Sequence, residues 1–156
     1  MWSSSRRGFI LSLLALSACG FEPVLAPEAT GGKLLGKVAI DVPADRDGYD
    51  FRTAFENRLG RVTVAQYDLH IDLQVTQTGV ATATDGRVTR HNLTGLAKFT
   101  LREGEKVLSQ DQVTSFVAHS TTGPTVSTLA AEQKAHQRLM IQLADRVVDH
   151  LLLTLD

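Results

Sequence analysis

YDLHIDLQVT, residues 67–76, alternates apolar and polar side chains at every position. Successive side chains of a β-strand point to opposite faces of a sheet, so this alternation predicts a strand with one buried and one solvated face. The apolar face carries Tyr67, Leu69, Ile71, Leu73 and Val75, and the polar face carries Asp68, His70, Asp72, Gln74 and Thr76. We expect the rest of the fold to pack against the apolar side.

A second strand with the same alternation follows this one. Its apolar face carries Leu93, Gly95, Ala97, Phe99 and Leu101. Asp85-Gly86, between the two strands, is a strong hairpin signal. A two-residue turn there would place Leu73 opposite Lys98, which sets the apolar faces on opposite sides of the sheet. We therefore predict a three-residue loop, or a β-bulge at a strand glycine, that restores a pairing such as Ile71 with Phe99.

Two shorter or weaker strands complete the predicted sheet. Residues 35–42 are apolar and β-branched, which indicates a first strand that ends at Pro43. Residues 107–118 follow a tight turn at 103–105 and alternate less regularly. This weaker pattern predicts a fourth strand at an edge of the sheet.

Two amphipathic helices accompany the strands. The first is predicted to have an apolar stripe of Tyr49, Phe51, Phe55 and Leu59, an N-cap at Asp47 or Asp50 and a C-cap at Gly60. The second follows Pro124 and extends over about 125–153, with an apolar stripe of Leu129, Leu139 or Met140, Leu143, Val147 and Leu151. Its solvated face is predicted to carry Lys134, Arg138, Gln142, Asp145, Arg146 and Asp149. The order β-α-β-β-β-α predicts an α+β fold, a two-layer sandwich with two helices packed on one face of a four-stranded, mostly antiparallel sheet.

SRRGFILSLLALSACGFEP, residues 5–23, has the layout of a secretory signal. Its apolar run is shorter than the roughly 20 residues needed to span a bilayer. Leu-Ser-Ala-Cys at 16–19 resembles the bacterial lipobox, whose cysteine is lipidated and becomes the first mature residue. We expect a lipoprotein signal peptide at 1–18, a lipidated tether at 19–33 and a single domain at 34–156. Residues 5–11 also resemble a twin-arginine motif, so the export route stays open.

The composition limits the classes of partner. The formal net charge is −1, and removal of Arg6 and Arg7 makes the mature chain more acidic, which argues against nucleic-acid binding. Cys19 is the only cysteine, so the mature domain has no disulfide, cysteine metal ligand or thiol nucleophile. Membrane attachment then depends on lipid at Cys19. Gly20, in place of an aspartate, favours the outer membrane.

The sequence carries no recognisable motif for catalysis or metal binding. Its five histidines and its carboxylates do not form a HExxH, GxSxG, phosphate-loop or metal-spaced pattern. We expect no enzyme activity, no metal and no cofactor beyond the lipid on Cys19. Arg87, Arg90 and Lys98, with Arg102, place positive charge near one face or the tip of the third strand. Two interpretations stay open, solubility charges paired with aspartates across the hairpin, or a contact to an anion such as a glycolipid phosphate.

Three features together resemble the LptE family, the lipopolysaccharide-assembly lipoproteins of the outer membrane. These are CGFEPVL at 19–25, the predicted order of elements, and a terminal helix that contains QLADRVVDHLLLTL at 142–155. The resemblance covers essentially the whole mature chain. It implies a non-enzymatic subunit that plugs a large LptD-like β-barrel, helps it assemble, binds lipopolysaccharide and helps deliver it to the outer leaflet. The domain is then expected to face the periplasm and the inside of that barrel.

The resemblance assigns one residue and leaves others as candidates. The family's lipid-modified cysteine corresponds to Cys19. Arg87, Arg90 and Lys98 match no family motif and are candidate lipopolysaccharide-binding residues from charge and predicted exposure. The tip of the long hairpin is expected to contact the barrel through Thr82, Thr84, Asp85 and Gly86.

Two other classes of function are compatible with an exported lipoprotein. A free-standing periplasmic module that binds a lipid or peptide predicts a monomer with a concave apolar pocket. The plug predicts a closed core and a tight, stoichiometric partner. A lipid-anchored hydrolase requires a nucleophile and a base, which the sequence does not place together.

Overall fold

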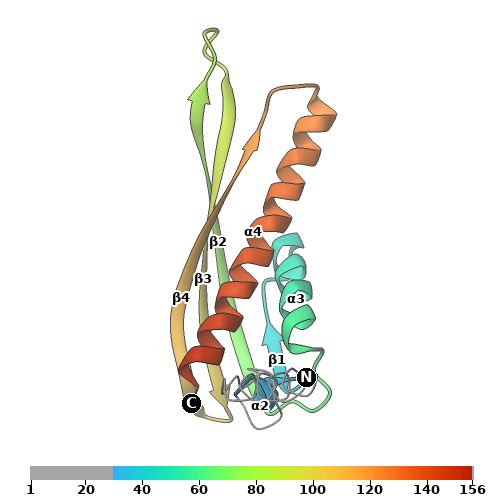
Figure 1. Ribbon diagram of the computed structural model, residues 1–156, viewed down its shortest axis with the longest axis vertical. Helices are drawn as coiled ribbons and strands as arrows, with labels where there is room; N and C mark the ends of the chain where they lie inside the picture. Colours follow the sequence, from blue (N-terminus) through green and yellow to red (C-terminus); the bar gives the residue numbers. More distant parts are fainter. Residues whose placement is uncertain (1–29, 156) are drawn as a thin grey trace, which may run out of the picture.

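A computed structural model describes residues 30–155, and Figure 1 shows a twisted sheet with two long helices on one of its faces. The elements are α2 (Thr30–Leu34), β1 (Val38–Asp41), α3 (Arg46–Leu59), β2 (Tyr67–Thr82), β3 (Val88–Glu103), β4 (Lys106–Ser120) and α4 (Thr125–Thr154). The predicted α+β sandwich is confirmed. The expected signal peptide, Cys19 and most of the tether lie outside the described residues. The last residues of the expected tether form the short helix α2.

The register of the central hairpin places the apolar sides of β2 and β3 on one face. Ile71 lies opposite Phe99, as predicted, and this register holds along most of the hairpin. The strands are joined by a three-residue loop, 84–86, which the N–H of Ala83 closes by donating to the carbonyl of Arg87 at 2.8 Å. Two register shifts lie close to the loop, one from an extra residue in β2 and the other from an extra residue in β3, and they cancel one another. The three-residue loop therefore keeps the apolar sides of both strands on the same face of the sheet.

β1 and β4 form the two edges of the sheet, whose order is β1-β2-β3-β4. β4 runs antiparallel to β3 as the predicted edge strand, whereas β1 runs parallel to β2, which requires the crossover through α3. The first strand begins at Val38 and not at Leu35, because Gly36 turns the chain after α2 with a φ of 68°. The N–H of Gly36 donates to the carbonyl of Leu59 at 2.8 Å, which ties this turn to the end of α3.

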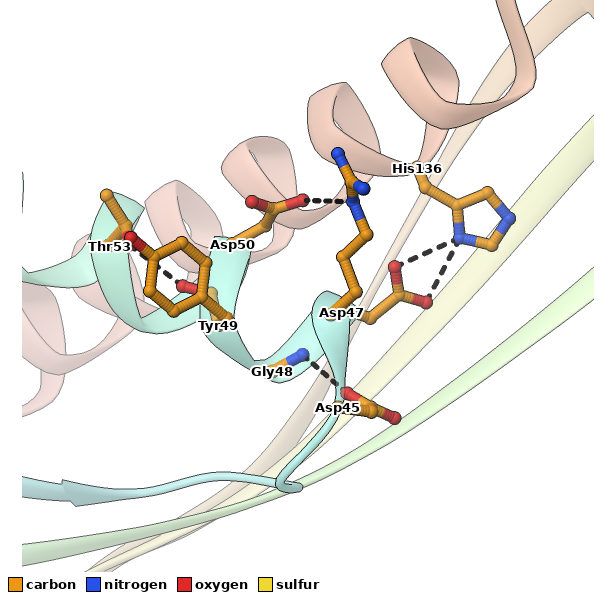
Figure 2. A network of polar contacts seen from close by, with 8 residues as sticks. Asp45, Asp47, Gly48, Tyr49, Asp50, Thr53 and His136 are labelled. Atoms are coloured by element: carbon orange, nitrogen blue, oxygen red, sulfur yellow. Dashed lines mark hydrogen bonds and ion pairs between the residues drawn. The ribbon is translucent and has the colours of Figure 1, made fainter. Parts of the chain in front are cut away.

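The N-cap of α3 is Asp45, so the predicted caps Asp47 and Asp50 are wrong. Asp45 has an extended backbone, and its carboxylate accepts a hydrogen bond from the N–H of Gly48 at 2.8 Å (Figure 2). Asp47 lies inside the helix, where its two carboxylate oxygens are each 3.0 Å from Nδ1 of His136 on α4. The first turn of α3 is thereby fixed to the neighbouring helix.

The buried stripe of α3 excludes Tyr49, contrary to the prediction. Phe51, Phe55 and Leu59 are at most 1% exposed, whereas Tyr49 is 69% exposed. Residues 49 and 51 are about 200° apart around a helix, so they cannot share one face. Gly60 ends the helix with a φ of 75°, as predicted.

The early turns of α4 lie beyond the part of the sandwich that α3 covers. The buried residues of α4 begin at Ala135, and the first turn of α3 lies beside His136 (Figure 2). Leu129, which was predicted to belong to the buried stripe, is therefore 55% exposed. The later part of the stripe is buried as predicted and includes Leu139, Met140, Leu143, Val147 and Leu151.

Of the six polar residues predicted on the solvated face of α4, five are exposed and Asp145 is intermediate. Some of these side chains also bind neighbouring elements. Arg58 of α3 donates from Nη1 to Asp145 at 2.7 Å and from Nη2 to Asp149 at 2.9 Å. These carboxylates raise the pKa of the Arg58 guanidinium above its usual value, and the hydrogen bond to Asp149 is the largest cause. The Oε1 of Gln142 accepts a hydrogen bond from the hydroxyl of Ser115 on β4 at 2.8 Å.

Gly95 allows α4 to approach the centre of the sheet. A Cβ atom at this position would lie 2.8 Å from Cδ1 of Leu143 and 3.1 Å from Cγ of Leu139. Both leucines are fully buried. The missing side chain of Gly95 is therefore a packing requirement at the point where helix and sheet meet.

We expect Gly95→Val to lower the free energy of unfolding by about 2 kcal/mol, because the added side chain overfills this contact. Denaturant unfolding followed by circular dichroism measures the change. Thr94→Val, at the neighbouring exposed position on the opposite face, is the control and should change stability by less than about 0.5 kcal/mol. Equal losses in both variants would contradict the close packing at Gly95.

Candidate interaction surface

The β2–β3 hairpin projects past the beginning of α4 and forms one end of the molecule (Figure 1). Side chains of β2 from Gln77 to Thr82 are exposed on both faces of the ribbon. The candidate partner-contact residues Thr82, Thr84, Asp85 and Gly86 lie together at its tip and are all exposed. We call residues 80–88 the hairpin tip.

The hairpin tip is ordered by hydrogen bonds within its own loop. Asp85 accepts from the N–H of Arg87 at 3.1 Å and from its Nε at 2.7 Å. Gly86 has a φ of 84°, a conformation that suits glycine, and its N–H donates to the carbonyl of Ala83 at 3.0 Å. The backbone N–H of Arg87, followed by its guanidinium, lowers the pKa of the Asp85 carboxyl below its usual value. The tip therefore presents a preformed loop.

The three candidate lipopolysaccharide-binding residues do not form one cluster. Arg87 lies on the tip and is engaged by Asp85. Arg90 is exposed near the tip, and no carboxylate within residues 30–155 pairs with it. Lys98 lies between Asp72 and Gln112 in the sheet, about 26 Å further along β3 at 3.3 Å per residue. A single bound phosphate cannot contact all three.

The sheet face opposite the helices is open and mostly polar. Its central rows contain Gln74, Thr76 and Thr78 on β2, Asn92, Thr94 and Leu96 on β3, and Thr114 and Phe116 on β4. The ring of Phe116 is 69% exposed. A shallow depression of about 460 Å³ near Lys98 is lined by residues that include His70, Asp72 and Gln110. We call the whole sheet face opposite the helices the outer sheet face. It presents hydroxyl and amide groups together with one aromatic ring.

The sequence did not reveal a pair of histidines on the helix-facing side of the sheet. His91 on β3 lies opposite His119 on β4, and their rings stack with centroids 5.6 Å apart and an interplanar angle of 17°. His119 is only 6% exposed, and neither of its ring nitrogens has a hydrogen-bond partner in the described part of the chain. Only the register of β3 with β4 brings the two residues together.

Residues 30–155 contain neither a metal-binding cluster nor a helix that could span a membrane. No group of three or more histidine, cysteine, aspartate or glutamate side chains is arranged there to hold a metal ion. None of the helices in this range is long and apolar enough to cross a membrane.

The fold and the open surface define the class of protein, a small α+β sandwich with one sheet face covered by helices and the other free. Several bacterial structures share this fold at low identity. A Caulobacter crescentus CB15 protein has a TM-score of 0.67 and 16% identity, with 80% of this chain and 93% of that chain covered. Rare lipoprotein B from Shewanella oneidensis has a TM-score of 0.59 and 11% identity, with 76% and 93% covered.

A minor lipoprotein from Acinetobacter baumannii has a TM-score of 0.61 and 16% identity, with 76% of this chain and 91% of that chain covered. Among curated proteins, none matches the sequence. The family model described as LptE, lipopolysaccharide-assembly, matches residues 35–151. The chain belongs to the LptE family.

The contact between Asp85 and Arg87 predicts how the stability of the hairpin tip depends on pH. The folded-state pKa of Asp85 lies below its unfolded value of 3.8, so its contact with Arg87 stabilises the loop above that pH and is lost as the pH falls through the folded-state pKa. Carboxyl chemical shifts measured by NMR should show Asp85 titrating below 3.8. In Arg87→Gln the midpoint should rise, although the backbone hydrogen bond remains. An unchanged midpoint in the variant would contradict the role of the guanidinium.

Proposed function

We propose that this protein is a lipid-anchored outer-membrane subunit of the lipopolysaccharide translocon. In this role it plugs a large LptD-like β-barrel, helps the barrel assemble and helps deliver lipopolysaccharide to the outer leaflet, without catalysis. The family match over residues 35–151 carries the proposal, because it includes the whole sheet, α3 and most of α4. The three proteins of the same fold described above are all named lipoproteins, which agrees with a lipid anchor at Cys19.

The surface of the domain suits the inside of a wide barrel. The lumen of a large outer-membrane barrel is polar and hydrated. The outer sheet face presents threonine, glutamine and asparagine side chains that hydrogen-bond to such a wall. The hairpin tip adds a preformed loop that reaches past the helices (Figure 1). Binding energy spread over such a broad polar surface makes each single contact modest.

The packing of the core favours the plug over a free-standing lipid- or peptide-binding module. Large side chains such as Phe51, Phe55 and Phe99 fill the space between helices and sheet and are at most 2% exposed. One depression of about 320 Å³ lies outside this core, between the start of α3 and α4. It is lined by Leu129 and by the charged side chains Asp45, Asp47 and Glu132, and it is wide open to solvent. A site for a lipid or peptide ligand is expected to enclose most of the ligand surface, which an open depression does not do.

We expect a tagged full-length chain, extracted from outer membranes of its own bacterium in mild detergent, to co-purify with a large β-barrel protein in a stoichiometric complex. Mass spectrometry of the eluted material identifies the partner. Recovery of the lipoprotein alone would overturn the plug and favour a free-standing module.

Cys19→Ala tests the anchor separately in the same preparation. Exported with a cleavable signal peptide of a non-lipidated protein in place of residues 1–18, the Cys19→Ala protein should keep the barrel partner, because the complex depends on the folded domain. It should leave the membrane fraction when no barrel is present. Loss of the partner with the lipid would show that the anchor, and not the domain surface, holds the complex.

The candidate basic residues are tested by binding of the purified chain to lipopolysaccharide. The triple variant Arg87→Gln, Arg90→Gln, Lys98→Gln should bind severalfold more weakly, since it removes cations that attract lipid phosphates. The matched control removes three exposed cations elsewhere through Lys106→Gln, Lys134→Gln and Arg146→Gln. Equal losses of affinity in the two variants would show that binding depends only on net charge. Arg87, Arg90 and Lys98 would then not be a specific lipopolysaccharide site.

A further inference from the structure

One long edge of the sheet has no strand beside it. β1 pairs with β2 only from Tyr67 to His70, but β2 continues to Thr82. Among residues 30–155 no other strand pairs with this side of residues 71–82. Every second residue of that stretch directs its N–H and C=O away from β3. We call residues 71–82 the open edge of β2, and at about 3.3 Å per residue it is about 40 Å long.

The opposite edge of the sheet, on β4, is protected by charges and by a covering side chain, whereas the open edge of β2 is regular from residue 71 to 79 and has a register shift only beside the hairpin tip. β4 has a register shift at Leu108, and charged side chains at Lys106 and Asp111 interrupt it. Arg138 of α4, which was predicted to be solvated, donates to the carbonyl of Ala118 at 3.4 Å. Bulges, charges and covering groups are the usual means of preventing strand addition at an edge.

The open edge of β2 is suited to strand addition. Between residues 71 and 82 the sequence contains no proline, and Asp72 is the only charged residue. Thr76 and Thr78 have β-propensity, and the side chains beyond Val75 are exposed. Beyond Val75, an added strand would therefore displace no buried side chain.

We infer that the open edge of β2 binds an extended segment of the β-barrel partner, which adds a strand to the sheet through backbone hydrogen bonds. This inference rests on the proposed function and names how the partner is held. The segment should be free of proline, with hydroxyl or amide side chains on the outer sheet face and an apolar side chain beside Leu73 and Val75, which are half-buried. A carboxylate near its end would pair with Arg90.

A second copy of this chain fits the open edge less well. Antiparallel pairing of two copies over residues 71–82 would bring loop 84–86 of each copy to the level of residues 67–70 of the other. That position beside β2 is already occupied by β1. A partner segment that ends before His70 meets no such obstacle.

Amide hydrogen exchange tests the inference on the complex isolated from outer membranes, with the lipoprotein alone as reference. Peptides that cover the open edge should contain amides that exchange at least about tenfold more slowly in the complex, because exchange reports backbone hydrogen bonding. Amides on the free side of β4 are the internal comparison and should gain less protection. Unchanged exchange at the open edge in an intact complex would overturn the inference and leave the proposed function standing.

Two other outcomes separate the inference from the proposed function. If no barrel protein co-purifies, the proposed function fails and the inference fails with it. If the open edge becomes protected in the lipoprotein alone as its concentration rises, a second copy is the occupant and the inference is overturned.

Proline substitutions give an independent test of the backbone. Thr76 and Gln77 are neighbours in the regular part of the hairpin, so one of them directs its N–H to β3 and the other to the open edge. Of Thr76→Pro and Gln77→Pro, each removes a backbone N–H, so the variant that loses a hydrogen bond to β3 should unfold at a lower temperature. The variant that keeps its unfolding temperature then identifies the residue whose N–H faces the open edge. That variant should recover severalfold less barrel partner. Thr76→Val and Gln77→Val, which keep the N–H, should recover the wild-type amount, and full recovery by the stable proline variant would overturn the inference.

Discussion

The alignment of β2 with β3 is the constraint on which the other features depend. With Ile71 opposite Phe99, both strands present their apolar side chains to the same face, and α3 and α4 have one surface on which to pack. A slip of one residue would divide those side chains between two faces and leave neither helix a continuous contact. The three-residue loop at 84–86 keeps this alignment, so a short polar turn at the end of the molecule determines which side of the sheet is covered.

β1 and α3 are shorter than β2, β3 and α4, so they cover only one end of the sheet. The molecule therefore has two parts. The part near β1 contains the buried core, the close contact at Gly95 and the ion pairs of Arg58. The part near the hairpin tip has neither β1 beside it nor α3 above it (Figure 1). Stability therefore resides mainly in the first part. β2 and β3 run continuously from the first part into the second and hold the second part in position. The backbone and polar side chains of the second part stay available to a partner.

The sequence was sufficient for features that depend on local periodicity and insufficient for those that depend on pairing. Alternation in residues 67–76 predicted the central strand, and the hydrophobic pattern required the hairpin register that was found. Leu129 was placed in a buried stripe because an apolar residue at a helical period does not show whether another element covers it. Tyr49 was wrong for a different reason, since it lies off the helical period of Phe51 and Phe55. The stacking of His91 on His119 and the open edge of β2 both follow from strand order and strand length. These become visible only once the strands are paired.

The parallel pairing of β1 with β2 also has a consequence for the order in which the chain folds. β2, β3, β4 and α4 follow one another through short connections, so their contacts close small loops and form early. β1 pairs with β2 only after the chain has crossed over through α3, so no residue of β1 is closer in sequence than 29 positions to its partner, whereas each hairpin can begin to pair beside its own turn. We expect the hairpins and α4 to assemble first and β1 with α3 to dock afterwards. Among the described elements of the sandwich, those nearest the N-terminus, β1 and α3, would then be the last to join the folded domain.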